Sequence, residues 1–240
     1  MASGESSIPV RISAALPLLP ASPVGRGGYG RPVELREALA DPRARLGVGV
    51  ATLLATAGAA RRDHVGAWEA RGFRAVNGLP DALYPPAWIV MQMGAFGAVP
   101  AAAATAWRAG DGELAGRLLL GGTGAWALSK LVKQVVRRPR PTALLPGIRG
   151  RGREPAGLGY LSGHAAVAVA LGVTALPRLG PAARALTLTA MSLVGLTRLY
   201  VGAHLLLDIA GGAALGLAAE AAAGLVTSGC ALGRKARAER

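Results

Sequence analysis

Long apolar segments recur along this chain, and no other feature of the sequence limits its fold as strongly. A helix needs about 20 mostly apolar residues to cross a bilayer, with a lower limit of about 17. Five segments reach that length, namely residues 83–107, 118–136, 161–179, 185–201 and 205–226. The sequence therefore predicts a membrane protein built from helices.

A shorter apolar segment precedes these five. Residues 46–60 fall below the usual length, but Arg45 and Arg61 at its two ends can extend their side chains out of a short span. The next segment, 65–76, mixes Trp68 and Phe73 with charged residues, which is typical of a helix in the membrane interface. We therefore predict an all-α polytopic membrane helical bundle of about six transmembrane helices, with an interfacial helix after the first.

The composition agrees with helices packed in a bilayer. Hydrophobic residues make up 52% of the chain and its mean hydropathy is +0.38, although it carries 27 basic side chains. Aromatic residues are only 4%, so small residues are expected to form the helix contacts, as they do between transmembrane helices. An alanine-rich soluble helical bundle is the alternative.

The net charge of +14 raises the question of an anionic partner. Basic patches neutralise nucleic-acid phosphates, but the basic residues here lie mostly between apolar segments, and no nucleic-acid motif is present. The membrane bilayer with its anionic lipids is therefore the predicted partner, and nucleic acid is not. Cys230 is the only cysteine, which excludes an internal disulfide and a cysteine-based zinc site.

The segments divide the chain into three parts. Residues 1–44 are predicted to form a flexible cytoplasmic tail, residues 45–229 a membrane-embedded domain, and residues 230–240 a basic cytoplasmic tail. With six helices, both termini lie on one side of the membrane and the loop 137–159 lies on the other. The distribution of Lys and Arg does not decide the orientation, because this loop is itself rich in arginine.

Charged and polar residues gather in three clusters at the ends of these segments. The first cluster starts at Lys133, near the end of segment 118–136. Lys130, Lys133 and Arg137 share one side if the helix continues. The prolines on either side of Arg140 then stop the helix and hold that residue in a stiff, extended turn. Taken alone, the cluster is equally typical of a basic membrane anchor.

The second cluster is Ser162-Gly163-His164, directly before the apolar run that starts at Ala165. Ser162 is a favourable helix N-cap, and Gly163 allows a ligand to approach the backbone closely. Free N–H groups at the start of a helix bind anions. Serine and glycine also start helices that bind nothing, so this cluster alone does not identify a site.

The third cluster places Arg198, His204 and Asp208 in otherwise apolar sequence. Ionisable groups inside a membrane segment cost about 2.5 to 3.5 kcal/mol on insertion scales and are treated as functional by default. His204 and Asp208 are four residues apart, hence on one helical face, where the carboxylate can orient the imidazole. A structural His–Asp pair between two helices is the alternative, but it leaves Arg198 without an anion.

Together, the three clusters resemble a known signature. Lys-x6-Arg-Pro, Ser-Gly-His and Arg-x5-His-x3-Asp, in this order, are typical of the type-2 phosphatidic acid phosphatase superfamily. The first motif fits Lys133 with Arg140, whereas a pairing of Lys130 with Arg137 fits less well because arginine, not proline, follows Arg137. The resemblance covers about residues 83 to 219.

The resemblance implies a role for each motif residue. His204 is expected to attack phosphorus and form a phosphohistidine, with Asp208 accepting a hydrogen bond from its other ring nitrogen. His164 is expected to protonate the leaving group and then to activate water. The residues expected to bind the phosphate are Lys133, Arg140, Ser162, Gly163 and Arg198.

Two positions depart from the family pattern. Leu161 replaces the usual proline before Ser-Gly-His, and Thr197 replaces the usual serine before the third-motif arginine. Both departures bear on substrate preference and rate more than on the type of reaction, because neither removes a reacting group. Three cations offset the charge of a phosphate, so no metal and no cofactor is predicted. Zinc bound by His164, His204 and Asp208 is the alternative.

The resemblance implies an integral membrane phosphatase that acts on a lipid phosphate monoester or diphosphate at the extracytoplasmic surface. Phosphatidic acid, phosphatidylglycerol phosphate and polyprenyl diphosphate all suit that geometry. A non-catalytic protein that binds or moves anionic lipids is the alternative, and loss of a catalytic histidine would indicate it. Haloperoxidase chemistry is a further alternative, but those relatives of the family are soluble.

Overall fold

A computed structural model describes residues 40–62, 64–153 and 157–238. These residues form α-helices and short 3₁₀-helices, without a strand among them, which confirms the all-α prediction. The predicted tail 1–44 lies outside the described residues as far as residue 39. The first described helix begins at Pro42, three residues before the predicted domain boundary, and the Asp41 side chain caps it by accepting the Arg43 N–H.

The described helices follow most of the predicted segments. Segments 46–60 and 118–136 each lie in one helix, segments 185–201 and 205–226 each lie in one helix except for one end residue, and two consecutive helices cover 163–178 of segment 161–179. The bounds are α2 (Pro42–Ala60), α3 (Ala67–Asn77), η1 (Asp81–Leu83), α4 (Tyr84–Gln92), α5 (Ala98–Arg108), α6 (Gly112–Val136), α7 (Pro141–Leu144), α8 (Gly163–Ala175), η2 (Leu176–Arg178), α9 (Pro181–Tyr200) and α10 (Leu206–Ala238).

The prediction of one continuous helix over 83–107 is wrong. The segment forms α4 and α5, and residues 93–97 between them are not helical. Pro100 explains part of the break, because its ring would clash with the Phe96 carbonyl of a continuous helix. Gly94 lies in the break against the start of α8, where a Cβ would be 2.5 Å from the His164 carbonyl oxygen. The break therefore brings this segment close to a predicted site residue.

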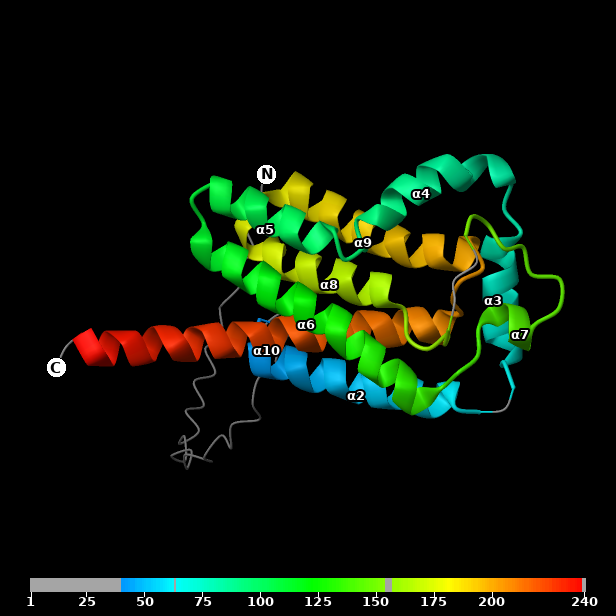
Figure 1. Cartoon of the computed structure of the whole chain (residues 1–240), viewed down its shortest axis with the longest axis horizontal. Helices are drawn as coiled ribbons and strands as arrows, with labels where there is room; N and C mark the ends of the chain where they lie inside the picture. The colour runs from blue at the N-terminus through cyan, green and yellow to red at the C-terminus, as the bar shows by residue number, and fades with distance from the viewer. Residues whose placement is uncertain (1–39, 63, 154–156, 239–240) are drawn as a thin grey trace, which may run out of the picture. The chain divides into compact units, whose positions relative to one another are not determined.

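α10 is the central helix of the described bundle. It packs against α2, α6 and α8, and Figure 1 shows α2 running beside it. The contact with α8 depends on two glycines four residues apart, an arrangement typical of close helix packing in membranes. A Cβ on Gly212 would lie 2.3 Å from the Ser162 carbonyl oxygen, and one on Gly216 would lie 2.3 Å from that of Ala166. These contacts fix the start of α8 against α10.

α3 lies near the end of the bundle where α6 ends and α10 begins (Figure 1). It covers most of the predicted interfacial segment 65–76 and is amphipathic, with Phe73 buried and Trp68 57% exposed. Glu69, one of the charged residues of this segment, is only 1% exposed. One charged side chain of the amphipathic helix is thus part of the interior.

The outer surface of the described bundle is apolar. Leu54 on α2, Ile89 on α4, Leu131 on α6 and Leu186 on α9 are each more than 60% exposed, at 66%, 65%, 63% and 71%. Large apolar side chains exposed on several helices suit contact with lipid. Among the described residues, one helical stretch, Leu206–Gly229, has both the length and the composition needed to cross a membrane.

Substitution of Gly216 tests the contact between α8 and α10. Gly216→Ala places a methyl group against the Ala166 backbone, and we expect it to destabilise the protein by about 1–3 kcal/mol, as overpacking does. Gly124→Ala on α6 is the matched control, because no atom lies within 4 Å of its Cβ position. Thermal unfolding in detergent measures the stability of both variants. Equal melting temperatures of the two variants would show that the contact is not tight.

Candidate active site

The three polar clusters meet where α6 ends and α8 and α10 begin, and they line one cavity of about 260 Å³. All of the predicted site residues except Ser162 and Asp208 line this cavity. Its full lining is Gly94, Ala95, Phe96, Trp126, Ser129, Lys130, Lys133, Arg140, Gly163, His164, Arg198 and His204. No acidic side chain lines it in the described part of the chain, so the cavity suits an anion.

Lys133 connects the first cluster to the second. It lies in the last turn of α6, and its Nζ donates to the Leu161 carbonyl at 2.5 Å and to the Leu158 and Gly159 carbonyls at 3.3 Å each. Lys130, one turn earlier, also lines the cavity, with its ammonium 5.3 Å from the Trp126 ring centroid. The structure thus places two ammonium groups on the α6 side of the cavity.

Arg140 adopts the extended backbone that the flanking prolines predict, with φ −73° and ψ 160°. Its Nη1 donates to the Ala203 carbonyl at 2.8 Å and lies 3.3 Å from His204 Nε2, while its Nε donates to the Gly157 carbonyl at 3.2 Å. Burial lowers the pKa of this guanidinium, and the Asp208 carboxylate partly opposes that effect. Arg140 therefore contacts the imidazole that is expected to react.

Arg137 does not share the side of Lys133 as a continuous helix would require. α6 ends at Val136, and Arg137 follows it in a left-handed conformation with φ 55°. Its side chain lines a different cavity, together with Arg61 and His64. Of the two possible first-motif pairings, the structure brings Lys133 and Arg140 together and separates Lys130 from Arg137.

Ser162 caps α8, as its position before an apolar run predicts. Its hydroxyl accepts the Ala165 N–H at 3.3 Å, and its own N–H donates to the Asp208 carbonyl at 2.9 Å. The residue has no exposed surface and does not line the cavity. Gly163 and His164 form the first turn of α8 at the cavity wall, where unpaired helix N–H groups attract anions.

Arg198 lies in the last turn of α9 and is 8% exposed. Its Nη1 contacts the Met91 sulfur, its Nε has no hydrogen-bond partner, and it forms no ion pair with any described residue. A buried cation with no anion is costly. A bound anion in the adjacent cavity would supply the missing charge.

His204 lies in the turn between α9 and α10, with Asp208 in the first turn of α10. His204 Nδ1 is 3.6 Å from Asp208 Oδ2, longer than a hydrogen bond, and that oxygen accepts the Leu205 N–H at 2.8 Å. Burial lowers the pKa of His204 to about 3, against the opposing effect of Asp208. The imidazole is therefore neutral at physiological pH, as a nucleophile must be.

Sequence reasoning missed two residues that contact Asp208 or its partner. Arg138 donates to Asp208 Oδ1 at 2.9 Å and pairs with Glu69 at 2.7 Å. Arg138 lies within the first motif, but its position in the sequence does not distinguish it from the neighbouring arginines. Glu69 could have been noticed as the one acidic residue of an otherwise basic amphipathic segment, although its partner is 69 residues away.

The loop 137–159 is anchored by contacts that no motif indicates. Arg151 donates to the Asn77 and Tyr200 carbonyls at 2.9 and 2.6 Å and lies over the Tyr200 ring, 4.1 Å from its centroid. Asn77 accepts the Arg149 N–H at 2.9 Å. These bonds hold the loop against the ends of α3 and α9. The same loop carries Arg140, whose guanidinium is bonded to the Gly157 and Ala203 carbonyls.

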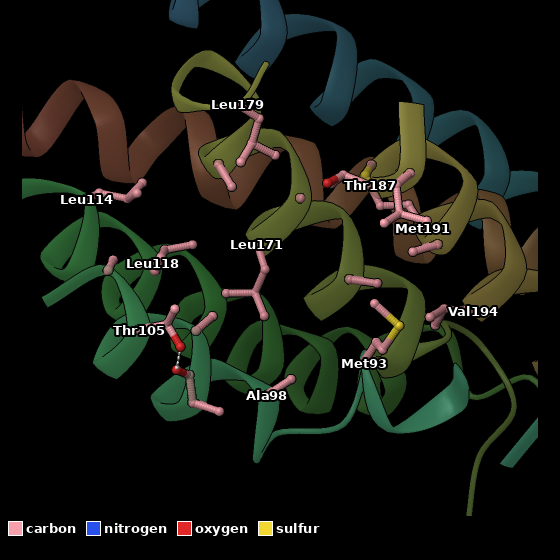
Figure 2. A pocket seen from close by; sticks show the side chains of 18 of the residues that line it. Met93, Ala98, Thr105, Leu114, Leu118, Leu171, Leu179, Thr187, Met191 and Val194 are labelled. Atoms are coloured by element: carbon pink, nitrogen blue, oxygen red, sulfur yellow. Dashed lines mark hydrogen bonds between the residues drawn. The ribbon is translucent and has the colours of Figure 1, made fainter. Parts of the chain in front are cut away.

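A second cavity, of about 550 Å³ and almost wholly apolar, lies among α5, α6, α8 and α9. Figure 2 shows Leu171 and Met191 on its walls, with Met93 and Val194 toward one end. It shares two helix faces with the first cavity. His164 is four residues from Ala168 on α8, and Arg198 is four residues from Val194 on α9, so each pair shares a face.

The PAP2 superfamily model matches residues 114–228, which contain all three motifs. Residues 114–228 belong to the PAP2 superfamily. This confirms the resemblance on which the predicted roles rest. No curated protein matches the chain in sequence.

Solved structures with the PAP2 fold are similar to this one. LpxE from Aquifex aeolicus is 20% identical with a TM-score of 0.61, and the match covers 67% of this chain and 97% of that chain. The first transmembrane PAP2 type phosphatidylglycerolphosphate phosphatase from Bacillus subtilis is 21% identical with a TM-score of 0.54, covering 76% of this chain and 94% of that chain. The chain therefore has the fold of a transmembrane PAP2 phosphatase.

The unmatched charge of Arg198 can be tested with a phosphate analogue. We expect Arg198→Gln to raise the Kd of orthovanadate by roughly 10- to 150-fold, because a hydrogen bond to a charged group contributes about 1.5–3 kcal/mol. Arg184→Gln is the control, since Arg184 is exposed on the same helix. Calorimetric titration measures both variants. An unchanged Kd in Arg198→Gln would mean that this arginine does not contact the anion.

Proposed function

We propose that the protein is an integral membrane phosphatase that hydrolyses a lipid phosphate monoester or diphosphate through a phosphohistidine on His204, without a metal. One observation carries the proposal: His164 and His204 line the same cavity as four cationic side chains. Among the described residues, no acidic side chain lines that cavity. A tetrahedral oxyanion is the ligand that this combination suits best. Membership of the PAP2 superfamily supports the same class of reaction.

The side-chain contacts of His204 define its proposed role. Because Arg140 donates toward Nε2, the ring proton is on Nδ1, on the side of the Asp208 carboxylate. A bound phosphate would compete for the Arg140 guanidinium and release the Nε2 lone pair. In the first step, this lone pair forms the N–P bond while the P–O bond to the leaving group breaks, and His164 donates a proton to the leaving oxygen.

The second step returns the enzyme to its starting state. His164, now neutral, takes a proton from water, and the hydroxide oxygen attacks phosphorus as the N–P bond breaks. Lys133, Arg140 and Arg198 stabilise the phosphoryl oxygens in both steps. Three cations supply the charge that a divalent metal would otherwise supply. In the described part of the chain, no three His, Cys, Asp or Glu side chains are grouped so as to hold a metal ion.

The apolar cavity supports a lipid as the substrate. It continues the helix faces that carry His164 and Arg198, and its lining is mostly alanine, leucine and methionine (Figure 2). From His164 to Ala175, α8 rises by about 16 Å. A tail of that length would lie in the cavity while its phosphate reaches the histidines. A soluble phosphate ester would gain nothing from such a cavity.

We propose six membrane crossings, formed by α2, α4 with α5, α6, α8 with η2, α9 and α10. The site then lies opposite the two termini, on the extracytoplasmic side. The basic residues near the site do not contradict this orientation, because Arg138 and Arg151 are engaged in contacts within the fold. The C-terminal residues 230–240 are basic, which favours the cytoplasm for that end.

The reaction is tested by incubating the purified protein with phosphatidic acid, phosphatidylglycerol phosphate and a polyprenyl diphosphate in the presence of a chelator. We expect the wild type to release phosphate from at least one of them, and His204→Ala to lose at least 1,000-fold in rate, because no N–P bond can form. Equal release by both proteins would remove His204 from the nucleophile role. Complete dependence on added metal would contradict the mechanism. No release from any lipid would favour the non-catalytic alternative.

The tail cavity is tested by filling it. Ala190→Phe puts a ring into the cavity, and displacing two or three methylenes at about 0.8 kcal/mol each should lower kcat/KM for a long-chain phosphatidic acid by roughly ten- to fifty-fold. Hydrolysis of dibutyryl phosphatidic acid should stay unchanged, because its tails are too short to reach the ring. Ala185→Phe, exposed on the same helix and outside the cavity, is the matched control. Equal losses on both substrates would refute the assignment.

A further inference from the structure

A buried network of charges lies behind the candidate nucleophile and outside its cavity. The Arg138 guanidinium donates to both oxygens of Glu69, at 3.1 and 2.7 Å, and to Asp208 Oδ1 at 2.9 Å. Glu69, Arg138 and Asp208 are 1%, 5% and 0% exposed. One cation is thus shared between two carboxylates with almost no contact to solvent.

The two carboxylates also cap the helix that follows His204. Asp208 Oδ2 accepts the Leu205 N–H at 2.8 Å, and Glu69 Oε1 accepts the Leu207 N–H at 2.9 Å. N–H groups at the start of a helix have no partner within it, and negative charge is favourable there. Glu69 comes from α3, which is 138 residues away in the chain from Leu207. The network therefore joins α3 and the α6–α7 loop to the start of α10.

These contacts determine how Asp208 faces His204. Arg138 holds Oδ1, so the carboxylate cannot rotate without breaking a buried ion pair. Oδ2 is consequently the oxygen directed toward His204 Nδ1, at 3.6 Å. The arrangement favours the tautomer with the proton on Nδ1, which leaves the Nε2 lone pair available on the cavity side.

Arg138 has no direct access to the substrate. It lines a different cavity, with Arg61, Arg62 and His64, and is not among the residues around the 260 Å³ cavity. Glu69 lines neither cavity. An effect of either residue on the reaction must therefore be indirect, through Asp208 or through the start of α10.

We propose that Glu69 and Arg138 are positioning residues for the reaction, which fix the orientation of Asp208 and thereby the tautomer of His204. The proposal rests on the proposed function, because it assigns these residues to the same nucleophile. Glu69 contacts Arg138, Arg138 contacts Asp208, and Asp208 faces the imidazole of His204.

Glu69→Gln tests the proposal with little change in shape. The amide can still accept the Leu207 N–H, but it loses the charge that holds Arg138. We expect kcat for dibutyryl phosphatidic acid to fall by roughly 10- to 100-fold, with KM and the Kd of orthovanadate within two-fold of wild type. Glu220→Gln is the matched control, since Glu220 is also 1% exposed and pairs with Arg45 at 2.5 Å, but has no link to Asp208. It should lower stability without lowering kcat.

Arg138→Lys is a second variant in case Glu69→Gln folds poorly. Lysine keeps the charge but cannot donate to both carboxylates in the planar geometry of arginine, so kcat should be intermediate between wild type and Arg138→Gln. If Glu69→Gln and Glu220→Gln lose the same fraction of kcat, the role of Glu69 is structural only. A parallel loss of orthovanadate affinity would mean that the cavity itself has collapsed, and would overturn the proposal.

Nitrogen NMR of ¹⁵N-histidine-labelled protein reports the tautomer without turnover. The chain has three histidines, and the resonances of His204 are assigned by their absence in His204→Ala. We expect protonation at Nδ1 in the wild type and a mixture of tautomers in Glu69→Gln. An unchanged tautomer would overturn the proposal even if the wild type is active. An inactive wild type would refute the proposed function, and the tautomer would then decide the inference by itself.

Discussion

The Arg138 guanidinium, buried between the carboxylates of Glu69 and Asp208, is the interaction on which the geometry of the site depends. It joins α3, the α6–α7 loop and the start of α10, and each contributes a charge that would be costly alone in a low-dielectric interior. Both carboxylates also bond to N–H groups at the start of α10. Their arrangement therefore fixes the helix end that carries His204.

The cavity in front of this network has the opposite electrostatic character. The network pairs each of its charges within the protein, whereas the cavity is lined by cations and, among the described residues, by no carboxylate. Arg198 contributes charge there without an ion-pair partner in the described structure. The charges behind the nucleophile thus pair with one another inside the protein, whereas the side chains that line the cavity are predominantly cationic. The charges that hold Asp208 and the charges that line the cavity can therefore lie close to each other on opposite sides of His204.

Close packing of small residues makes that separation possible. Gly212 and Gly216 allow α8 to approach α10 until backbone and side-chain atoms touch, which places Ser162 against Asp208. A larger residue at either position would move the α8 N-terminus, and with it His164, away from His204. The same preference for small residues leaves an alanine-rich cavity beside the site. The close helix packing and the apolar cavity therefore both involve the small residues that dominate the composition.

The sequence by itself determined the helical class, most of the helices and the three motifs, because apolar length, helix-stopping prolines and motif spacing are local properties. It also determined the PAP2 resemblance, which the family match confirms. Only the tertiary structure decided that segment 83–107 is broken, that Ser162 is a buried cap, and that Glu69 and Arg138 stand behind Asp208. Those facts depend on contacts between residues far apart in the chain, where burial and charge pairing outweigh any local pattern.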